Sequence, residues 1–337
     1  MSRHGADRRG AHFKPTPSIA DPLDSPAYRG DAASRRRRDT CGGGRGRRFV
    51  ASLVATALLL LGGVLLMLPV ISACLAQVEA EATLEEWNER ILSDTAAVDA
   101  AYEGMLAYND LIRSGGAGAI NDPFALDGST IGDIVLPDGI VGTVDIPAMG
   151  ISIPLYLGAT PENLSVGLGV ISGTSMPTGG ADTNTVIAGH RGVNSGLTMF
   201  RDIEKLQPGD VVTVRTPWDV LDYRVSEMRV IDPDDTEAVG VQEGRELLTL
   251  LTCHPYGSNR TRMMVVCERD HGGDAESRDP SSRSVVEKMG DAVIATLVPT
   301  VSMESPSLMV EGTLRILGLV LVIGSLASII VRLVRQR

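Results

Sequence analysis

The stretch Leu247-Leu248-Thr249-Leu250-Leu251-Thr252 decides the fold, because it is an apolar run that ends on a lone cysteine, Cys253. A short apolar run of this kind predicts a buried β-strand. Nine residues after the cysteine, Arg262 opens a second such run, Met263–Cys267, and an earlier run ends on Gly189-His190-Arg191-Gly192. A thiol, an imidazole and a guanidinium therefore each lie at the edge of a predicted strand. These groups are the minimum needed for thiol-based acyl transfer.

The surrounding region, from about residue 140 to 270, consists of short β-like runs separated by turn residues, with little helix between them. This pattern predicts an all-β domain, either a closed barrel or a sandwich. A short helix is expected at residues 197–205. The predicted strands are residues 140–146, 151–157, 185–188, 210–215, 221–231, 247–252 and 263–267.

Two apolar stretches enclose this region. Residues 49–75 exceed the roughly 20 residues needed to cross a bilayer, and residues 314–331 form a shorter, nearly charge-free stretch. Residues 1–48 hold 12 Arg and Lys against 5 Asp and Glu, a net charge of +7, and residues 314–337 hold four arginines and no acid. Since basic flanks stay inside, both termini are expected in the cytoplasm and the acidic middle outside. The alternatives are a cleaved signal peptide for the first stretch and a buried core helix for the second.

The segments next to the membrane have different compositions. Residues 1–48 lack apolar periodicity and are rich in Arg and Gly, which predicts a disordered cytoplasmic tail that contacts anionic lipid rather than nucleic acid. Apolar residues recur with a period of about 3.6 over residues 77–113, which predicts an amphipathic helix that ends at Gly115-Gly116. A polar linker and a helix are expected over residues 271–312.

Several motifs, taken in their order along the chain, resemble those of the sortases, which are membrane-anchored cysteine transpeptidases of Gram-positive bacteria. The resemblance covers about residues 140–270 and implies the eight-stranded sortase β-barrel. Val170 stands where many relatives carry a second histidine, which does not belong to the catalytic set. The motifs are Gly142-Thr143-Val144-Asp145-Ile146-Pro147, Gly173-Thr174-Ser175-Met176-Pro177, Ala188-Gly189-His190-Arg191-Gly192, and TLxTC followed by Pro255, Asn259 and Arg262.

The resemblance implies a role for each catalytic candidate. Cys253 would be the nucleophile, and nearby positive charge would favour its thiolate. His190 would give a proton to the leaving amine and take one from the incoming amine. Arg262 would stabilise the tetrahedral oxyanion. No cofactor is expected, and no pair of residues has metal-ligand spacing.

Neighbouring residues offer alternatives to these candidates. His254 adjoins the cysteine, but adjacent residues of an extended chain point to opposite faces, so a surface or capping role is expected for it. Arg260 would share the face of Arg262 in a regular strand, and the family spacing selects Arg262. A structural role is expected for Arg191. Strand parity argues against a bond from Cys253 to Cys267, which is expected to be a buried, inert thiol.

The tripeptide Asp122-Pro123-Phe124 lies in the loop before the first predicted strand. As bare sequence it is a common turn. In this context it resembles the lid of class C, pilus-polymerising sortases. The resemblance implies that Asp122 pairs with Arg262 and that Phe124 shields Cys253 until substrate or motion displaces the lid.

These features predict a class C sortase. Such an enzyme cleaves an LPXTG-like sorting signal between Thr and Gly through a thioester, and passes the acyl group to a lysine amine of the next pilin. The alternative is a housekeeping-type sortase that anchors proteins to a cell-wall precursor, and a third hypothesis is an inactive, membrane-tethered binding module. The expected partners are pilin subunits or the wall precursor, together with membrane lipid and without nucleic acid.

The expected organisation is a two-pass cell-membrane protein whose catalytic domain lies outside the cell. It comprises a tail (1–48), a transmembrane helix (49–75), an N-terminal helix (76–116), a lid loop (117–139), a catalytic barrel (140–270), a linker and helix (271–312), a second transmembrane helix (313–332) and a short cytoplasmic tail (333–337).

Overall fold

A computed structural model of the chain describes residues 43–115, 134–192, 197–272, 290, 293–294, 296–297 and 306–336. The account below concerns mainly residues 50–337, which form one compact unit. The predicted lid, Asp122-Pro123-Phe124, lies outside the described residues, as does most of the predicted linker over 271–312.

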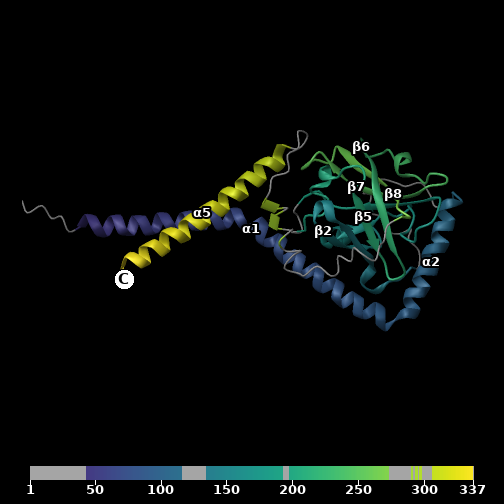
Figure 1. Ribbon diagram of the computed structural model, residues 1–337, viewed down its shortest axis with the longest axis horizontal. Coiled ribbons are helices and arrows are strands. Elements are labelled where there is room, and N and C mark those ends of the chain that lie inside the picture. The colour runs from purple at the N-terminus through teal and green to yellow at the C-terminus, as the bar shows by residue number, and fades with distance from the viewer. Residues whose placement is uncertain are drawn as a thin grey trace, which may run out of the picture. The chain divides into compact units, whose positions relative to one another are not determined.

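Eight strands close into a barrel in the order β1-β2-β3-β4-β7-β8-β6-β5. Figure 1 shows this barrel with β2, β5, β6, β7 and β8 labelled. The structure therefore confirms the barrel and excludes the sandwich. The strands are β1 (Ile140–Ile146), β2 (Ile151–Tyr156), β3 (Leu168–Val170), β4 (Thr183–Ala188), β5 (Val211–Arg215), β6 (Val220–Ile231), β7 (Glu246–His254) and β8 (Thr261–Arg269).

Alternate residues of the strands face two different apolar clusters, as the two-residue period of a strand requires. On β7, Leu248 and Leu250 belong to the large interior cluster, whereas Leu247 and Leu251 belong to a second cluster on the outer face. β8 alternates in the same way, with Cys267 inside. Both faces of these strands are thus buried, which explains why β7 is a continuous apolar run rather than an alternating one.

Seven of the observed strands match the predicted runs, whereas the strand β3 and the helix α3 were not predicted. β3 has only three residues, and helix α3 (Pro161–Val166) only six, capped by the Thr160 hydroxyl. Such lengths carry too little periodicity to be recognised. The helix predicted over residues 197–205 is wrong except for the 3-10 turn η4 (Ile203–Lys205). The backbone at Met199 has a positive φ of 31°, which a helix does not allow.

Helices precede and follow the barrel. α1 (Gly43–Ser93) and α5 (Pro306–Gln336) are both long and apolar enough to cross a membrane. The helix predicted over residues 77–113 is instead divided between α1 and α2 (Thr95–Arg113). Asp94 causes the break, because its carboxylate accepts a hydrogen bond from Ala97 N at 3.1 Å and so caps α2.

The C-terminal part of α1 and the whole of α2 are fastened to the barrel. Trp87 of α1 packs on Ile140, and its indole nitrogen donates to the Ile140 carbonyl at 3.2 Å. The Asn109 amide of α2 both donates to Met176 O (3.0 Å) and accepts from Met176 N (2.6 Å). The phenol oxygen of Tyr108 accepts from Gly173 N at 2.8 Å. Helix α2 therefore holds the loop that carries the Gly173–Pro177 motif.

The apolar stretches of α1 and α5 approach each other closely at two glycines. A Cβ atom on Gly63 would lie 2.8 Å from Val322 Cγ2, and one on Gly318 would lie 2.6 Å from Leu66 Cβ. Glycine at both positions lets two helix backbones pack at short range, as is common between membrane-spanning helices.

Candidate active site

Strand pairing brings His190, Cys253 and Arg262 to one end of three adjacent strands. β7 and β8 are antiparallel, with Cys253 directly opposite Arg262. β4 and β7 are parallel, with Ala188 opposite Leu251. His190 lies two residues past Ala188 and Cys253 two residues past Leu251, so the chain brings the two residues side by side. Gly189 N donates to Leu251 O at 3.2 Å, which carries this parallel pairing one residue beyond β4.

The three side chains also share a face of the sheet. Ala188, Leu251 and Met264 all belong to the outer apolar cluster. Cys253 and Arg262 lie within β7 and β8, two residues from Leu251 and Met264, so strand parity directs both to the outer face. His190 stands two residues past Ala188, where the hydrogen bond from Gly189 N to Leu251 O continues the pairing and favours the same face. The thiol, the imidazole and the guanidinium are therefore supplied from neighbouring strands to one spot.

Backbone contacts around these residues set their positions. The Thr252 hydroxyl, from the TLxTC motif, donates to Gly189 O at 2.7 Å and ties the cysteine strand to the histidine loop. The carbonyl of His190 accepts from Phe200 N at 3.1 Å. The Arg262 guanidinium donates to Asn259 O at 2.8 Å and to Thr261 O at 3.2 Å, and its side chain is buried.

The exposure of the three residues suits their proposed chemistry. Cys253 and His190 are half-buried, while Arg262 is only 6% exposed. Burial lowers the pKa of His190 from its ordinary value of 6.5. The permanent charge of a buried arginine acts strongly on nearby groups because water screens it poorly. The site is thus suited to stabilising a thiolate and an oxyanion.

Arg260 and Cys267, two of the neighbouring residues considered from the sequence, do not join the three candidates. Arg260 is exposed in the loop before β8. Cys267 is a free, fully buried thiol, and burial raises its pKa well above the usual range. The alternative of a bond from Cys253 to Cys267 is therefore wrong, and the burial of Cys267 is confirmed, while its low reactivity stays a prediction.

His254 faces away from Cys253, as parity predicts, but the expected surface role is wrong. It is 6% exposed, and its Nδ1 atom accepts a hydrogen bond from Arg191 at 2.7 Å. Arg191 forms a buried ion pair with Glu204 of η4, which confirms its structural role. The inner side of this strand end is covered by the η4 segment, and this buries His254. Glu204 carried no sequence signal, because it lies 13 residues from Arg191 in a segment expected to be helical.

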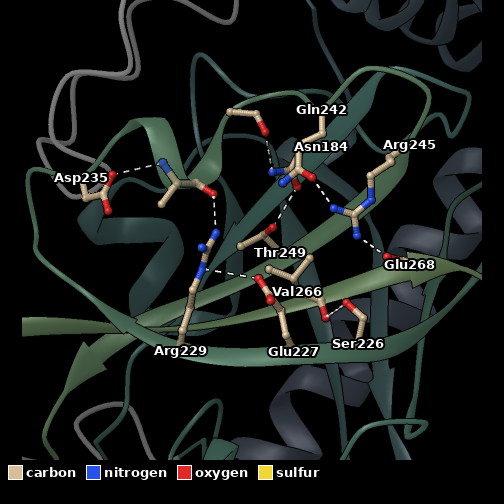
Figure 2. A network of polar contacts seen from close by, with 12 residues as sticks. Asn184, Ser226, Glu227, Arg229, Asp235, Gln242, Arg245, Thr249, Val266 and Glu268 are labelled. Carbon is tan, nitrogen blue, oxygen red and sulfur yellow. Dashed lines mark hydrogen bonds and ion pairs between the residues drawn. The ribbon is translucent and has the colours of Figure 1, made fainter.

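A polar network fastens the connection between β6 and β7 over the outer face of the sheet (Figure 2). It lies away from the ends of β7 and β8 that carry Cys253 and Arg262. Thr249 Oγ1 donates to Asn184 Oδ1 at 2.9 Å, and Asn184 Nδ2 donates to Val239 O at 2.9 Å and Gly240 O at 3.2 Å. Arg245, at the end of this connection, is bonded to Gln242 and to Glu268 of β8. Val239 also packs in the outer cluster with Ala188 and Leu251, so the connection covers part of the outer face of β4 and β7.

Comparison with known proteins identifies this arrangement. A family model described as the sortase domain matches residues 144–270, the region that contains all three catalytic candidates. A solved structure of sortase C from Streptococcus pneumoniae is 32% identical, covers 56% of this chain and 96% of its own, and superposes with a TM-score of 0.50.

The chain belongs to the sortase family. Curated relatives include Sortase D of Bacillus subtilis, 28% identical over 117 residues (34% of this chain, 54% of that protein), and Sortase A of Bacillus anthracis, 27% identical over 126 residues (37% and 58%). The chain thus spans somewhat more than half the length of the curated sortases it matches.

Proposed function

We propose that this protein is a class C sortase that joins pilin subunits through a thioester on Cys253. One observation carries the catalytic part of the proposal. Cys253, His190 and Arg262 come to the same face and the same end of the adjacent strands β4, β7 and β8. A nucleophile, a proton carrier and a fixed cation at one spot are what acyl transfer through a thiol needs.

In the proposed first half-reaction, the Cys253 thiolate attacks the carbonyl carbon of the threonine in an LPXTG-like signal. The Arg262 guanidinium stabilises the oxyanion of the tetrahedral intermediate. His190, in its protonated form, gives its proton to the departing glycine amine as the carbon–nitrogen bond breaks. The products are a thioester on Cys253 and a free amine.

In the proposed second half-reaction, a lysine side-chain amine of another pilin attacks the thioester. His190 accepts the proton of that amine, the carbon–sulfur bond breaks, and the thiolate of Cys253 is restored. The new bond is an isopeptide. No external oxidant or energy source enters either step, because one amide is exchanged for another.

Two observations support class C over other sortases. The solved relative from Streptococcus pneumoniae is a sortase C, and its structure is described as giving insights into catalysis and pilin substrate specificity. The chain also has a second helix, α5, long and apolar enough to cross a membrane. The proposed lid, Asp122-Pro123-Phe124, would add a third feature of that class.

The housekeeping alternative also has an observation in its favour. Several curated relatives are named Sortase A, including those of Bacillus anthracis and Staphylococcus aureus. In that case the same thioester would pass to an amine of a cell-wall precursor, so only the acceptor separates the two functions.

We further propose that α1 and α5 anchor the protein in the cell membrane, with both termini in the cytoplasm and the barrel outside. The basic flanks on both sides support this orientation, since residues 1–48 carry a net +7 and residues 314–337 carry four arginines and no acid. Labelling of single introduced cysteines at each terminus in intact cells and in opened cells tests the orientation.

The decisive experiment follows the thioester by intact-mass spectrometry. The full chain in lipid nanodiscs is incubated with an LPXTG-type peptide, with or without a pilin domain that presents a lysine. Cys253-dependent joining to lysine supports the class C assignment, and transfer only to a wall-peptide amine supports the alternative. Cys253→Ala is expected to abolish the adduct, and Phe124→Ala to accelerate it if the proposed lid covers the thiol.

The arginine assignment has a matched control two residues earlier, in the loop before β8. Arg262→Ala is expected to slow thioester formation by about 100-fold or more, on the scale of losing one oxyanion donor. Arg260→Ala removes an equal charge two residues away and is expected to change the rate less than about twofold. Equal losses in the two variants would refute the role given to Arg262.

A further inference from the structure

The loop between β7 and β8 is tied to the membrane-anchoring candidate α5. This loop begins just after Cys253 and ends just before Arg262, so it joins two catalytic candidates. Tyr256, three residues past the cysteine, places its hydroxyl 3.0 Å and 3.1 Å from the two carboxylate oxygens of Glu311, which lies near the start of α5.

Glu311, whose side chain is 35% exposed, is itself paired on the helix side. Arg315, one turn further along α5, forms an ion pair with Glu311 at 3.0 Å and donates a second hydrogen bond to Thr296 O at 3.0 Å. The Arg315 side chain is only 6% exposed. The ion pair with Arg315 already restricts the Glu311 side chain. Less conformational entropy is therefore lost when Glu311 accepts the hydrogen bond from Tyr256.

The barrel side of the same junction includes the segment that supports His190. Arg201 is fully buried, and its charge acts on both Tyr256 and Arg315. Its neighbour Phe200 donates the backbone hydrogen bond to His190 O. The start of α5 therefore contacts the loop after Cys253 and lies within electrostatic reach of Arg201, the neighbour of the residue that bonds His190 O.

The chemistry of the junction favours a strong and directional contact. Burial first, and then the Glu311 carboxylate, raise the pKa of Tyr256, so its hydroxyl stays protonated and donates. A hydrogen bond to a charged acceptor is about twice as strong as a neutral one, and more so where water is excluded. Tyr256, Glu311 and Arg315 line one end of a cavity of about 720 Å³ whose remaining lining comes mainly from apolar side chains of α1 and α5.

We propose that Tyr256 and Glu311 are positioning residues through which α5 sets the geometry of the Cys253 loop. Helix α5 would then be part of the catalytic apparatus as well as an anchor. This inference rests on the proposed function, because it concerns the rate at which Cys253 is acylated. The affected step is the attack of the Cys253 thiolate on the peptide carbonyl. A small displacement of a nucleophile can lower the reaction rate by more than the free energy of the lost hydrogen bond would suggest.

The test measures thioester formation in the full chain in nanodiscs, under single-turnover conditions and over a range of LPXTG-type peptide concentrations. Tyr256→Phe and Glu311→Gln are each expected to lower the maximal rate by roughly tenfold while the half-saturating peptide concentration stays unchanged. The double variant is expected to be no slower than either single one, because both remove the same contact. Tyr102→Phe and Glu86→Gln, which lie on α2 and α1 away from the junction, serve as matched controls.

The outcomes separate this inference from the proposed function. If wild type forms no thioester, the proposed function fails. If wild type does so but both variants react at the wild-type rate, or their losses multiply in the double variant, the inference alone is overturned. Glu311→Asp keeps the carboxylate, so it is expected to recover most of the rate lost in Glu311→Gln; failure of this rescue also contradicts the inference.

Discussion

At the scale of single residues, the chain uses its two barrel cysteines in opposite ways. Cys253 is half-buried at the end of β7, whereas Cys267 faces the interior and is fully buried. A thiol reacts as its thiolate, and burial opposes that charge. We expect iodoacetamide to modify Cys253 and to leave Cys267 unmodified in the folded protein, as measured by peptide mass spectrometry after timed quenching. Labelling of Cys267 at a comparable rate would contradict the inward position of its side chain; a urea-unfolded sample controls for its intrinsic reactivity.

His190 links the site to the acid stability of the fold. Because burial lowers its pKa from 6.5, the folded state binds fewer protons than the unfolded state as pH falls through about 6.5. Its contribution therefore makes the free energy of unfolding decrease with acidity, until the pH lies below the folded-state pKa. We expect His190→Gln to weaken this decrease between about pH 7 and pH 5, measured by urea unfolding in detergent micelles. Above about pH 8, His190 is neutral in the folded and the unfolded state. The difference in free energy of unfolding between the wild type and His190→Gln should therefore not change with pH in that range.

At the scale of elements, the Arg191–Glu204 pair connects the histidine loop to η4 under the catalytic face. The side chains are 2% and 14% exposed, so removing one partner leaves a buried charge. We expect Arg191→Met to lower the free energy of unfolding by about 3–5 kcal/mol. Exposed Arg90 of α1, which pairs with Glu86 and Asp138, offers a control, since Arg90→Met should lower the free energy of unfolding much less than Arg191→Met does. Equal losses in the two variants would show that burial does not govern the Arg191 pair.

The pairing of β1 with β5 depends on the absence of a side chain at Gly142. A Cβ atom there would lie 1.9 Å from Arg215 O, a contact that backbone movement alone can relieve. We expect Gly142→Ala to lower the free energy of unfolding by about 1–3 kcal/mol or more. Gly104→Ala in α2 is the control, because its Cβ meets only the flexible Ile134 side chain at 3.2 Å and alanine favours the helix. A neutral Gly142→Ala variant would contradict the close approach of these strands.

At the scale of the whole molecule, the packing of α1 against α5 connects the two ends of the chain. Gly318 faces Leu66 closely, whereas Gly324, on the same helix, has open space around it. We expect Gly318→Leu to reduce resistance to unfolding in mixed detergent micelles by about 1–3 kcal/mol, and Gly324→Leu to leave it nearly unchanged. Thioester formation should slow only in the Gly318 variant, because α5 also carries Glu311. Indistinguishable behaviour of the two leucine variants would argue against close packing of these helices.

The sequence by itself determined the local features of this protein. Strands such as β1 and β7 and the apolar lengths of α1 and α5 follow from periodicity and composition, which act between near neighbours in the chain. The alternation of side chains along a strand even predicted that His254 and Cys267 face away from the side of the sheet that carries Cys253. The tertiary structure decided what depends on contacts between distant segments. The parallel register of β4 and β7 brings His190 beside Cys253 across 63 positions, His254 is buried by Arg191 and Glu204, and Tyr256 meets Glu311 across 55 positions. Such contacts depend on how complete elements pack, and no local periodicity encodes them.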